Sequence, residues 1–159
     1  MTLTQDQIDL IIYDFDGVMT DNRAMVDETG RESVMVNRSD GLAIGIIRGL
    51  GIEQLIVSTE TNVVVSARAG KIGVPVIQSV GDKKAVVAEY LRSHDIDPGR
   101  VAYVGNDIND REAMLHVGWP VCPADAYPEI RELSRIVLTT NGGYGVVREL
   151  LDHLGGIRD

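Results

Sequence analysis

Two carboxylates stand one residue apart at the end of the first apolar run, in the segment IDLIIYDFDGVMTD, residues 8–21. Residues i and i+2 of a strand lie on the same face, so Asp14 and Asp16 would lie side by side at the end of a strand. Two like charges held together are unfavourable unless a cation or a reaction uses them. The segment therefore indicates a metal site or a catalytic pair, and a pair of strand-end caps is the plain structural alternative.

Further polar side chains follow other apolar runs. They are Ser58, Thr59 and Glu60, then Asp82 and Lys83, then Asn106, Asp107 and Asp110. In an open parallel sheet, ligands bind beyond the carboxyl ends of the strands, so we expect these groups in one crevice. Mg²⁺ takes oxygen ligands, while a lysine and a hydroxyl suit phosphate oxygens. The set therefore predicts a Mg²⁺-dependent phosphoryl-transfer site.

The elements that position these groups are short apolar runs alternating with helical patterns. The predicted strands are residues 9–14, 53–59, 74–78, 100–105, 119–123 and 135–140, and the predicted helices are 40–50, 61–72, 82–94, 110–117, 127–134 and 145–154. Most strand-like runs are continuously apolar, which is typical of strands buried on both faces. This alternation predicts an α/β fold with a parallel sheet.

One segment breaks the alternation. Residues 23–37, RAMVDETGRESVMVN, alternate in polarity around Glu28-Thr29-Gly30, which predicts a β-hairpin with glycine in its turn. Such a hairpin could shade an active site, pair with another subunit, or be an additional edge hairpin without either role.

Composition sets the broad class. The chain has 159 residues, of which 44% are hydrophobic, and this predicts one domain over residues 1–159 with a full core. The net charge of −9 argues against nucleic acid or an anionic membrane as a partner, but leaves room for an anionic substrate at a locally positive site. Cys122 is the single cysteine, and no signal peptide or bilayer-spanning run is apparent, so we predict a cytoplasmic location.

The candidate site residues resemble four motifs of the haloacid dehalogenase (HAD) superfamily of phosphatases, and they occur in the same order along the chain. These are DFDGVMTD, the hydroxyl of Ser58 after IV, Lys83 in GDKKAVV, and GNDIND. The resemblance implies a three-layer, Rossmann-like parallel sheet with an inserted hairpin, and the chain lacks room for a large cap domain. Three further segments resemble the small capless branch of this superfamily: NRSDGLAI, ADAYPEI and NGGYGVVREL. That branch contains 3-deoxy-D-manno-octulosonate 8-phosphate phosphatases, sialic-acid-type 9-phosphate phosphatases and the C-terminal domain of some CMP-sialic acid synthetases. That branch implies a homotetramer in which one subunit's hairpin covers a neighbour's site.

The resemblance also implies roles for the two aspartates. Asp14 would be the nucleophile that forms an aspartyl phosphate. Asp16 would protonate the leaving oxygen and later take a proton from water, so its pKa must be raised. Asp14, the backbone carbonyl of Asp16 and Asn106 would hold the Mg²⁺.

The remaining implied roles concern the phosphoryl group and the support of the site. Ser58, Thr59 and Lys83 would bind the transferring phosphoryl group, and Lys84 is a competing candidate for the lysine. Asp107 and Asp110 would support the site, although either could also cap the following helix.

A clue to the substrate lies in TETNVVVSARAGK. If a helix begins near Thr61, Arg68 and Lys71 share a face and Glu60 lies at its start. The pattern resembles that of phosphatases for nine-carbon sugar acids, whereas octulosonate enzymes have a glycine-arginine pair where Thr59 and Glu60 stand. This favours a sialic-acid-type 9-phosphate, with octulosonate 8-phosphate next.

One residue departs from the resemblance. The active branch usually has an aspartate where this chain has Asn106, and an amide oxygen can bind Mg²⁺ but carries no charge. The alternative hypothesis is therefore a non-catalytic oligomerisation domain, like some domains fused to CMP-sialic acid synthetases. A receiver-type signalling module is set aside, because the run at residues 53–59 offers Val57 and Ser58 where such a module needs an aspartate.

Overall fold

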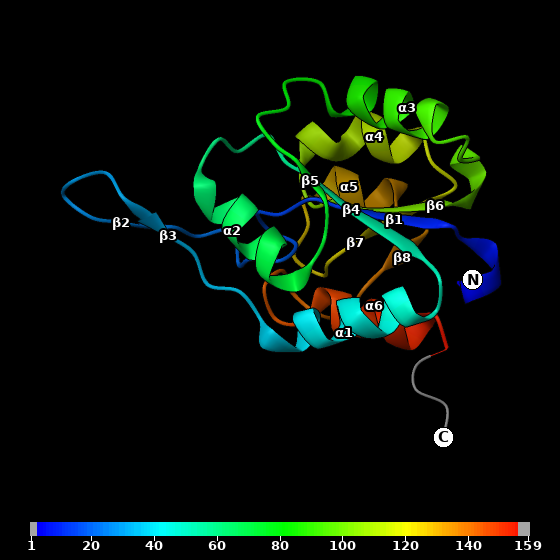
Figure 1. The fold of residues 1–159 in the computed structure, drawn as a ribbon, viewed down its shortest axis with the longest axis horizontal. Coiled ribbons are helices and arrows are strands. Elements are labelled where there is room, and N and C mark those ends of the chain that lie inside the picture. The colour runs from blue at the N-terminus through cyan, green and yellow to red at the C-terminus, as the bar shows by residue number, and fades with distance from the viewer. Residues whose placement is uncertain (1–2, 156–159) are drawn as a thin grey trace.

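A parallel sheet forms the centre of the molecule over residues 3–155, the part of the chain that the computed structural model describes (Figure 1). Its strands there are β1 (Leu10–Tyr13), β4 (Glu53–Val57), β5 (Val76–Ile77), β6 (Val101–Val104), β7 (Trp119–Cys122) and β8 (Ile136–Val137). They lie in the order β5-β4-β1-β6-β7-β8, and each pairing is parallel. Every apolar run predicted as a strand is confirmed, and with it the parallel α/β class.

Helices cover both faces of the sheet. On one face pack α1 (Arg38–Gly49), α2 (Val63–Ile72) and α6 (Val146–His153), and on the other α3 (Lys83–Ser93), α4 (Arg111–Leu115) and α5 (Pro128–Leu133). Short 3₁₀ turns are η1 (Gln5–Gln7), η2 (Pro98–Arg100) and η3 (Ile108–Asp110). The predicted three-layer fold is confirmed, and no large cap is present within the described range. None of the helices there is long and apolar enough to cross a membrane.

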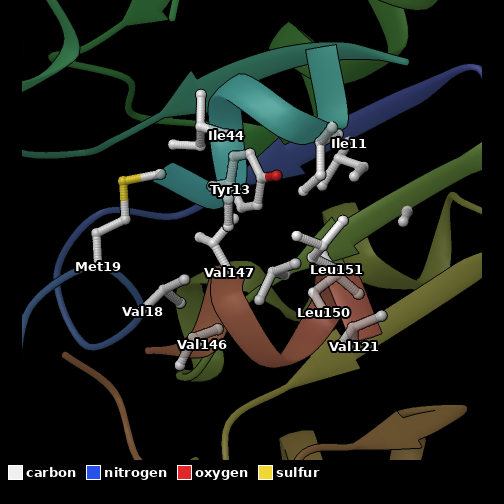
Figure 2. Close-up of a cluster of buried hydrophobic side chains, with 14 of the residues drawn as sticks. Ile11, Tyr13, Val18, Met19, Ile44, Val121, Val146, Val147, Leu150 and Leu151 are labelled. Atoms are coloured by element: carbon white, nitrogen blue, oxygen red, sulfur yellow. The ribbon is translucent and has the colours of Figure 1, made fainter. Parts of the chain in front are cut away.

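The strands read as continuous apolar runs because both of their faces are buried. Ile11 and Tyr13 of β1 pack toward α1 and α6, as Figure 2 shows, whereas Leu10 and Ile12 pack into the core on the side of α3, α4 and α5. The Tyr13 hydroxyl donates a 2.9 Å hydrogen bond to Oε1 of Gln54, so its buried polar atom is satisfied.

Helix boundaries differ from the predicted ones by a residue or two, because side-chain caps decide where a helix starts. Asn37 accepts a hydrogen bond from the backbone N–H of Ser39, so α1 begins at Arg38, before the predicted start. Asn62 likewise accepts a hydrogen bond from the backbone N–H of Val64, so α2 begins at Val63 rather than near residue 61.

The predicted hairpin is confirmed. Strands β2 (Met25–Val26) and β3 (Glu32–Ser33) pair antiparallel, and Gly30 adopts a φ of 82° in the turn that joins them. The hairpin extends away from the body of the molecule beside α2 (Figure 1). It leaves large apolar side chains in solvent, with Met25 77%, Val26 60% and Met35 73% exposed.

Two glycines let the loop before α6 support the loop after β1. The backbone N–H of Gly143 donates to the carbonyl oxygen of Val18 at 3.0 Å. A Cβ on Gly142 would overlap the backbone carbonyl of Gly17, so only glycine permits this approach. The segment NGGYG, residues 141–145, thus supports the loop that carries Asp14 and Asp16 through these backbone contacts.

Candidate active site

The site forms where β1 and β6 end side by side, at the point where the strand order reverses. The backbone N–H of Asp14 donates to the carbonyl oxygen of Val104 at 2.9 Å, which extends the β1–β6 ladder by one residue. This bond places Asp14 at the strand end that the sequence predicted, next to the loop that carries Asn106.

Lys83 joins two buried carboxylates. Its Nζ lies 2.8 Å from Oδ1 of Asp14 and 2.7 Å from Oδ1 of Asp110, and all three side chains are almost fully buried. Burial opposes the lysine's charge, but the two carboxylates outweigh it and raise the pKa of Lys83, which keeps the side chain protonated. The neighbouring Lys84 is exposed, so of these two lysines it is Lys83 that contacts Asp14 and Asp110.

Helix α3 positions this lysine. Asp82 is the N-cap of the helix, and its side chain accepts a hydrogen bond from the backbone N–H of Ala85. Lys83 is therefore the first helical residue, one position after the predicted start of this helix, and it is directed inward while Asp82 remains in solvent.

Asp110 is the most heavily hydrogen-bonded member of the site. Its Oδ1 accepts from Lys83 and from the Tyr103 hydroxyl, the latter at 2.9 Å. Its Oδ2 accepts from the backbone N–H groups of Asn106 and Asp107 at 2.9 and 3.3 Å. Asp110 therefore links the lysine to the loop that carries Asn106, while the Asp107 side chain accepts from the N–H of Ile108 at the start of η3.

Tyr103 is a member of the site that the sequence analysis missed. It lies in the apolar run of β6, where a buried tyrosine cannot be told from ordinary core. Burial, and then the carboxylates of Asp110 and Asp14, raise its pKa well above the ordinary value. The hydroxyl therefore keeps its proton and acts as a donor.

The pKa of Asp14 depends on its burial and on the charged groups around it. Burial, reinforced by the nearby carboxylate of Asp110, raises the pKa of Asp14 to about 7, although Lys83 opposes the shift. The N–H of Phe15 also donates to its Oδ1 at 2.8 Å. A cation at the free side of this carboxylate would favour its ionised form, which a nucleophile requires.

The surroundings of Asp16 favour the protonated form of its carboxyl group. Burial raises its pKa, and the neighbouring carboxylate of Glu60 raises it further. The Thr20 hydroxyl lies 3.4 Å from its Oδ1 and lowers the pKa only in part. A carboxyl group whose protonated form is favoured can donate a proton to a leaving oxygen.

Asn106 turns its amide toward two oxygens. One amide atom lies 3.0 Å from the carbonyl oxygen of Asp16 and 3.1 Å from Oδ2 of Asp14. With nitrogen at that position the amide donates to both oxygens, and with oxygen there three oxygens face one another. A Cβ on Gly17 would overlap this amide, so glycine makes room for it.

With oxygen at that position, the Asn106 amide, the Asp14 carboxylate and the Asp16 carbonyl would suit a magnesium ion. Ligands at about 2.0–2.1 Å in an octahedral site lie about 3 Å from their neighbours, which agrees with the 3.0 and 3.1 Å from the Asn106 amide atom to the other two oxygens. No three His, Cys, Asp or Glu side chains of residues 3–155 group as a metal site, so the set depends on an amide and a backbone carbonyl beside one carboxylate. Asp14, Asp16 and Asn106 are therefore brought together as the sequence predicted.

The candidate phosphate-binding hydroxyls differ in exposure. Ser58 follows β4, is buried, and its Oγ accepts the backbone N–H of Glu60 at 3.1 Å. Thr59 is exposed. Both lie at the carboxyl end of β4, next to β1, so a phosphoryl group at Asp14 would meet this loop.

The predicted substrate residues are only partly gathered. Glu60 lines a pocket of about 280 Å³ together with Asp16, Val64 and Glu32 of the hairpin. Its Oε1 also accepts the backbone N–H of Thr61 at 2.8 Å. Three carboxylates, those of Asp16, Glu32 and Glu60, therefore line this pocket together with Arg23.

Arg68 and Lys71 lie farther along α2. Arg68 stands one turn beyond Val64, and its Nη2 donates to the carbonyl oxygen of Asn37 at 3.0 Å. Lys71 is exposed near the end of the helix. The structure thus places Glu60 at the pocket and the two cations outside its lining.

The fold and this crevice place the protein among the α/β enzymes that bind a ligand beyond the strands of a parallel sheet. Residues 51–150 match the family described as haloacid dehalogenase-like hydrolases. The chain belongs to this family.

Individual relatives with a named substrate are more informative than the family as a whole. The chain is 33% identical over 146 residues to the 3-deoxy-D-manno-octulosonate 8-phosphate phosphatase of Yersinia pestis, covering 91% of this chain and 78% of that protein. A solved structure from Streptomyces avermitilis, assigned to the HAD hydrolases without a stated substrate, is 42% identical with a TM-score of 0.96 and covers 99% of this chain and 90% of that chain. The octulosonate phosphatase of Moraxella catarrhalis, solved with magnesium, phosphate and KDO, is 26% identical with a TM-score of 0.89 and covers 95% of this chain and 90% of that one.

Proposed function

We propose that the protein is a Mg²⁺-dependent cytoplasmic phosphatase that hydrolyses the phosphate ester of a 2-keto-3-deoxy sugar acid. The observation that carries the proposal is the buried Asp14–Lys83–Asp110 array beside the oxygens of Asp16 and Asn106. Family membership supports hydrolysis, and the named relatives support a sugar acid phosphate as the substrate class.

The reaction follows from the two aspartates. Asp14 attacks phosphorus, the bond from phosphorus to the ester oxygen breaks, and Asp16 gives its proton to that oxygen. Asp16 then takes a proton from water, which attacks the phosphorus of the aspartyl phosphate and frees both phosphate and Asp14. Lys83 and Ser58 hold the phosphoryl oxygens as negative charge moves over them. Bound Mg²⁺ supplies positive charge beside the nucleophile and the phosphate.

The choice of sugar acid has two candidates. The identity to octulosonate 8-phosphate phosphatases favours the eight-carbon substrate. Glu60, which lines the pocket beside Asp16, favours a sialic-acid-type 9-phosphate, because a carboxylate accepts hydrogen bonds from the hydroxyls of a longer polyol chain. Parallel assays of phosphate release from both esters decide between them.

The substrate carboxylate would be recognised by Arg68 and Lys71, which lie farther along α2, outside the lining of the pocket beside Glu60. We expect Arg68→Ala and Lys71→Ala each to raise KM for a keto sugar acid phosphate about tenfold, because each removes a charge-assisted contact. A small ester such as p-nitrophenyl phosphate cannot use these contacts, so its KM should change little. Arg131→Ala, an exposed arginine of α5, is the control. Equal losses on both substrates would remove the pair from this role.

The apolar hairpin supports a homotetramer in which it covers a neighbouring site. Exposed Met25, Val26 and Met35 would bury apolar surface on assembly. We expect light scattering at assay concentration to give four times the chain mass, and Met35→Asp to reduce both that mass and the activity. Leu115→Asp, on α4 away from the hairpin, should change neither. A native monomer with full activity would contradict this arrangement.

Substitution of Asn106 helps to distinguish the phosphatase hypothesis from that of a non-catalytic oligomerisation domain. Asn106→Asp adds a negative charge at the proposed Mg²⁺ ligands, so we expect about tenfold tighter Mg²⁺ binding by calorimetry. Asn109→Asp, an exposed position in the adjacent η3 turn, should leave the affinity unchanged. Unchanged affinity in Asn106→Asp would mean that Asn106 is not a ligand and that Asp107 or Asp110 is the better candidate.

The same pair of proteins tests the proposed activity. Phosphate release by the native protein that requires Mg²⁺ supports the phosphatase. If neither the native protein nor Asn106→Asp hydrolyses any keto sugar acid phosphate while both assemble normally, the oligomerisation domain becomes the better description.

A further inference from the structure

Tyr103 is a buried side chain to which none of the roles above has been given. It lies on β6, faces the core beneath α3 and α4, and is fully buried. Its hydroxyl donates at 2.9 Å to Oδ1 of Asp110, the same oxygen that accepts Lys83 at 2.7 Å. One carboxylate oxygen is therefore shared between a neutral donor and the cation that holds Asp14.

We propose that Tyr103 is a positioning residue, which sets where Asp110 holds Lys83 between the nucleophile and the phosphoryl group. The inference rests on the phosphatase activity proposed above. Lys83 can bind Asp14, Asp110 and a phosphoryl oxygen, and its position depends on how strongly each attracts it. By donating to Oδ1, Tyr103 satisfies part of the hydrogen-bonding capacity of Asp110 and leaves Lys83 shared with Asp14.

Loss of the hydroxyl would change this balance. The other oxygen of Asp110 is held by the backbone N–H groups of Asn106 and Asp107, so the carboxylate cannot rotate to find a new donor. Lys83 would then be drawn toward Oδ1 of Asp110, away from the phosphoryl oxygens that it stabilises as charge develops. The loss should fall on the transition state more than on substrate binding.

A purely structural role makes a different prediction. Buried tyrosine hydroxyls usually find a partner, and Tyr103 would then matter only for stability. Tyr13 is the matched control, because it is also fully buried, lies on the adjacent strand and faces the opposite helical layer (Figure 2). Its hydroxyl donates at 2.9 Å to Gln54, away from Lys83 and Asp110.

The experiment compares Tyr103→Phe with Tyr13→Phe. We expect Tyr103→Phe to lower kcat about tenfold with KM nearly unchanged, and Tyr13→Phe to leave kcat near the native value. Binding of orthovanadate in Mg²⁺, measured by calorimetry, should weaken in Tyr103→Phe by a similar factor, because vanadate resembles the transferring phosphoryl group. Thermal unfolding of both variants reports any loss of stability separately.

A double-variant cycle tests the route through Asp110. In an Asp110→Asn background, adding Tyr103→Phe should have little further effect on kcat or on vanadate binding, since the shared carboxylate is gone. Equal effects in both backgrounds, or a Tyr103→Phe protein with native kcat and vanadate affinity, would overturn the proposal. Failure of the proposed function looks different, because the native protein itself would then neither release phosphate nor bind vanadate, and the positioning role would fall with it.

Discussion

Asp14→Asn is expected to abolish phosphate release, with a loss of about 10³-fold or more, while the fold persists. An amide cannot attack phosphorus as a carboxylate does. The neighbouring carboxylate of Asp110 has both oxygens occupied by Lys83, Tyr103 and backbone N–H groups, and Asp16 is assigned the proton transfer, so neither is expected to replace Asp14. The side chain is of nearly the same size. The burial that raises the pKa of Asp14 to about 7 means that a neutral group is well tolerated at this position.

The measurement is phosphate release with Mg²⁺, together with circular dichroism and thermal unfolding. Asp82→Asn is the matched control, because Asp82 is exposed and caps α3, and asparagine caps a helix as well as aspartate does. That variant should retain native activity. Asp14 would lose the role of nucleophile if Asp14→Asn kept more than a tenth of the native rate.

Lys83→Met is the second change with a large expected effect. It preserves the length of the side chain but leaves the carboxylates of Asp14 and Asp110 buried without their cation. Breaking a buried pair in this way typically costs about 3–5 kcal/mol of stability. Loss of a cation from the phosphoryl site should also lower kcat by about 10²-fold or more.

The loss of stability should depend on pH in a defined direction. The pKa of Asp14 is already raised to about 7, and removal of the lysine charge raises it further. A carboxyl group with a raised pKa favours the folded state when protonated, so Lys83→Met should be less stable at pH 8 than at pH 6 relative to the native protein. Urea unfolding at both values measures this, with the exposed neighbour Lys84→Met as control. A Lys83→Met protein as stable as the native one at pH 8 would contradict the buried array.

Much of the fold could be predicted from the sequence, because the strands of a doubly covered parallel sheet are short and continuously apolar. The runs that became β1, β4 and β6 were recognisable for this reason, and so was the hairpin around Gly30. Helix ends were displaced by one or two residues, since they depend on which side chain caps them. Asn37 and Asn62 take that role through hydrogen bonds that a periodic pattern does not reveal.

The sequence by itself determined which kinds of groups meet at the site, because polar residues that end parallel strands share one edge of the sheet. It did not determine which lysine is used, where the substrate residues of α2 lie, or that Tyr103 belongs to the site. Those facts depend on contacts between distant segments, such as the bond from Lys83 to Asp110 across 27 positions of the chain. Only the tertiary structure decides them, because the direction of a side chain relative to a partner on another element is set by how α3, β1 and β6 pack together.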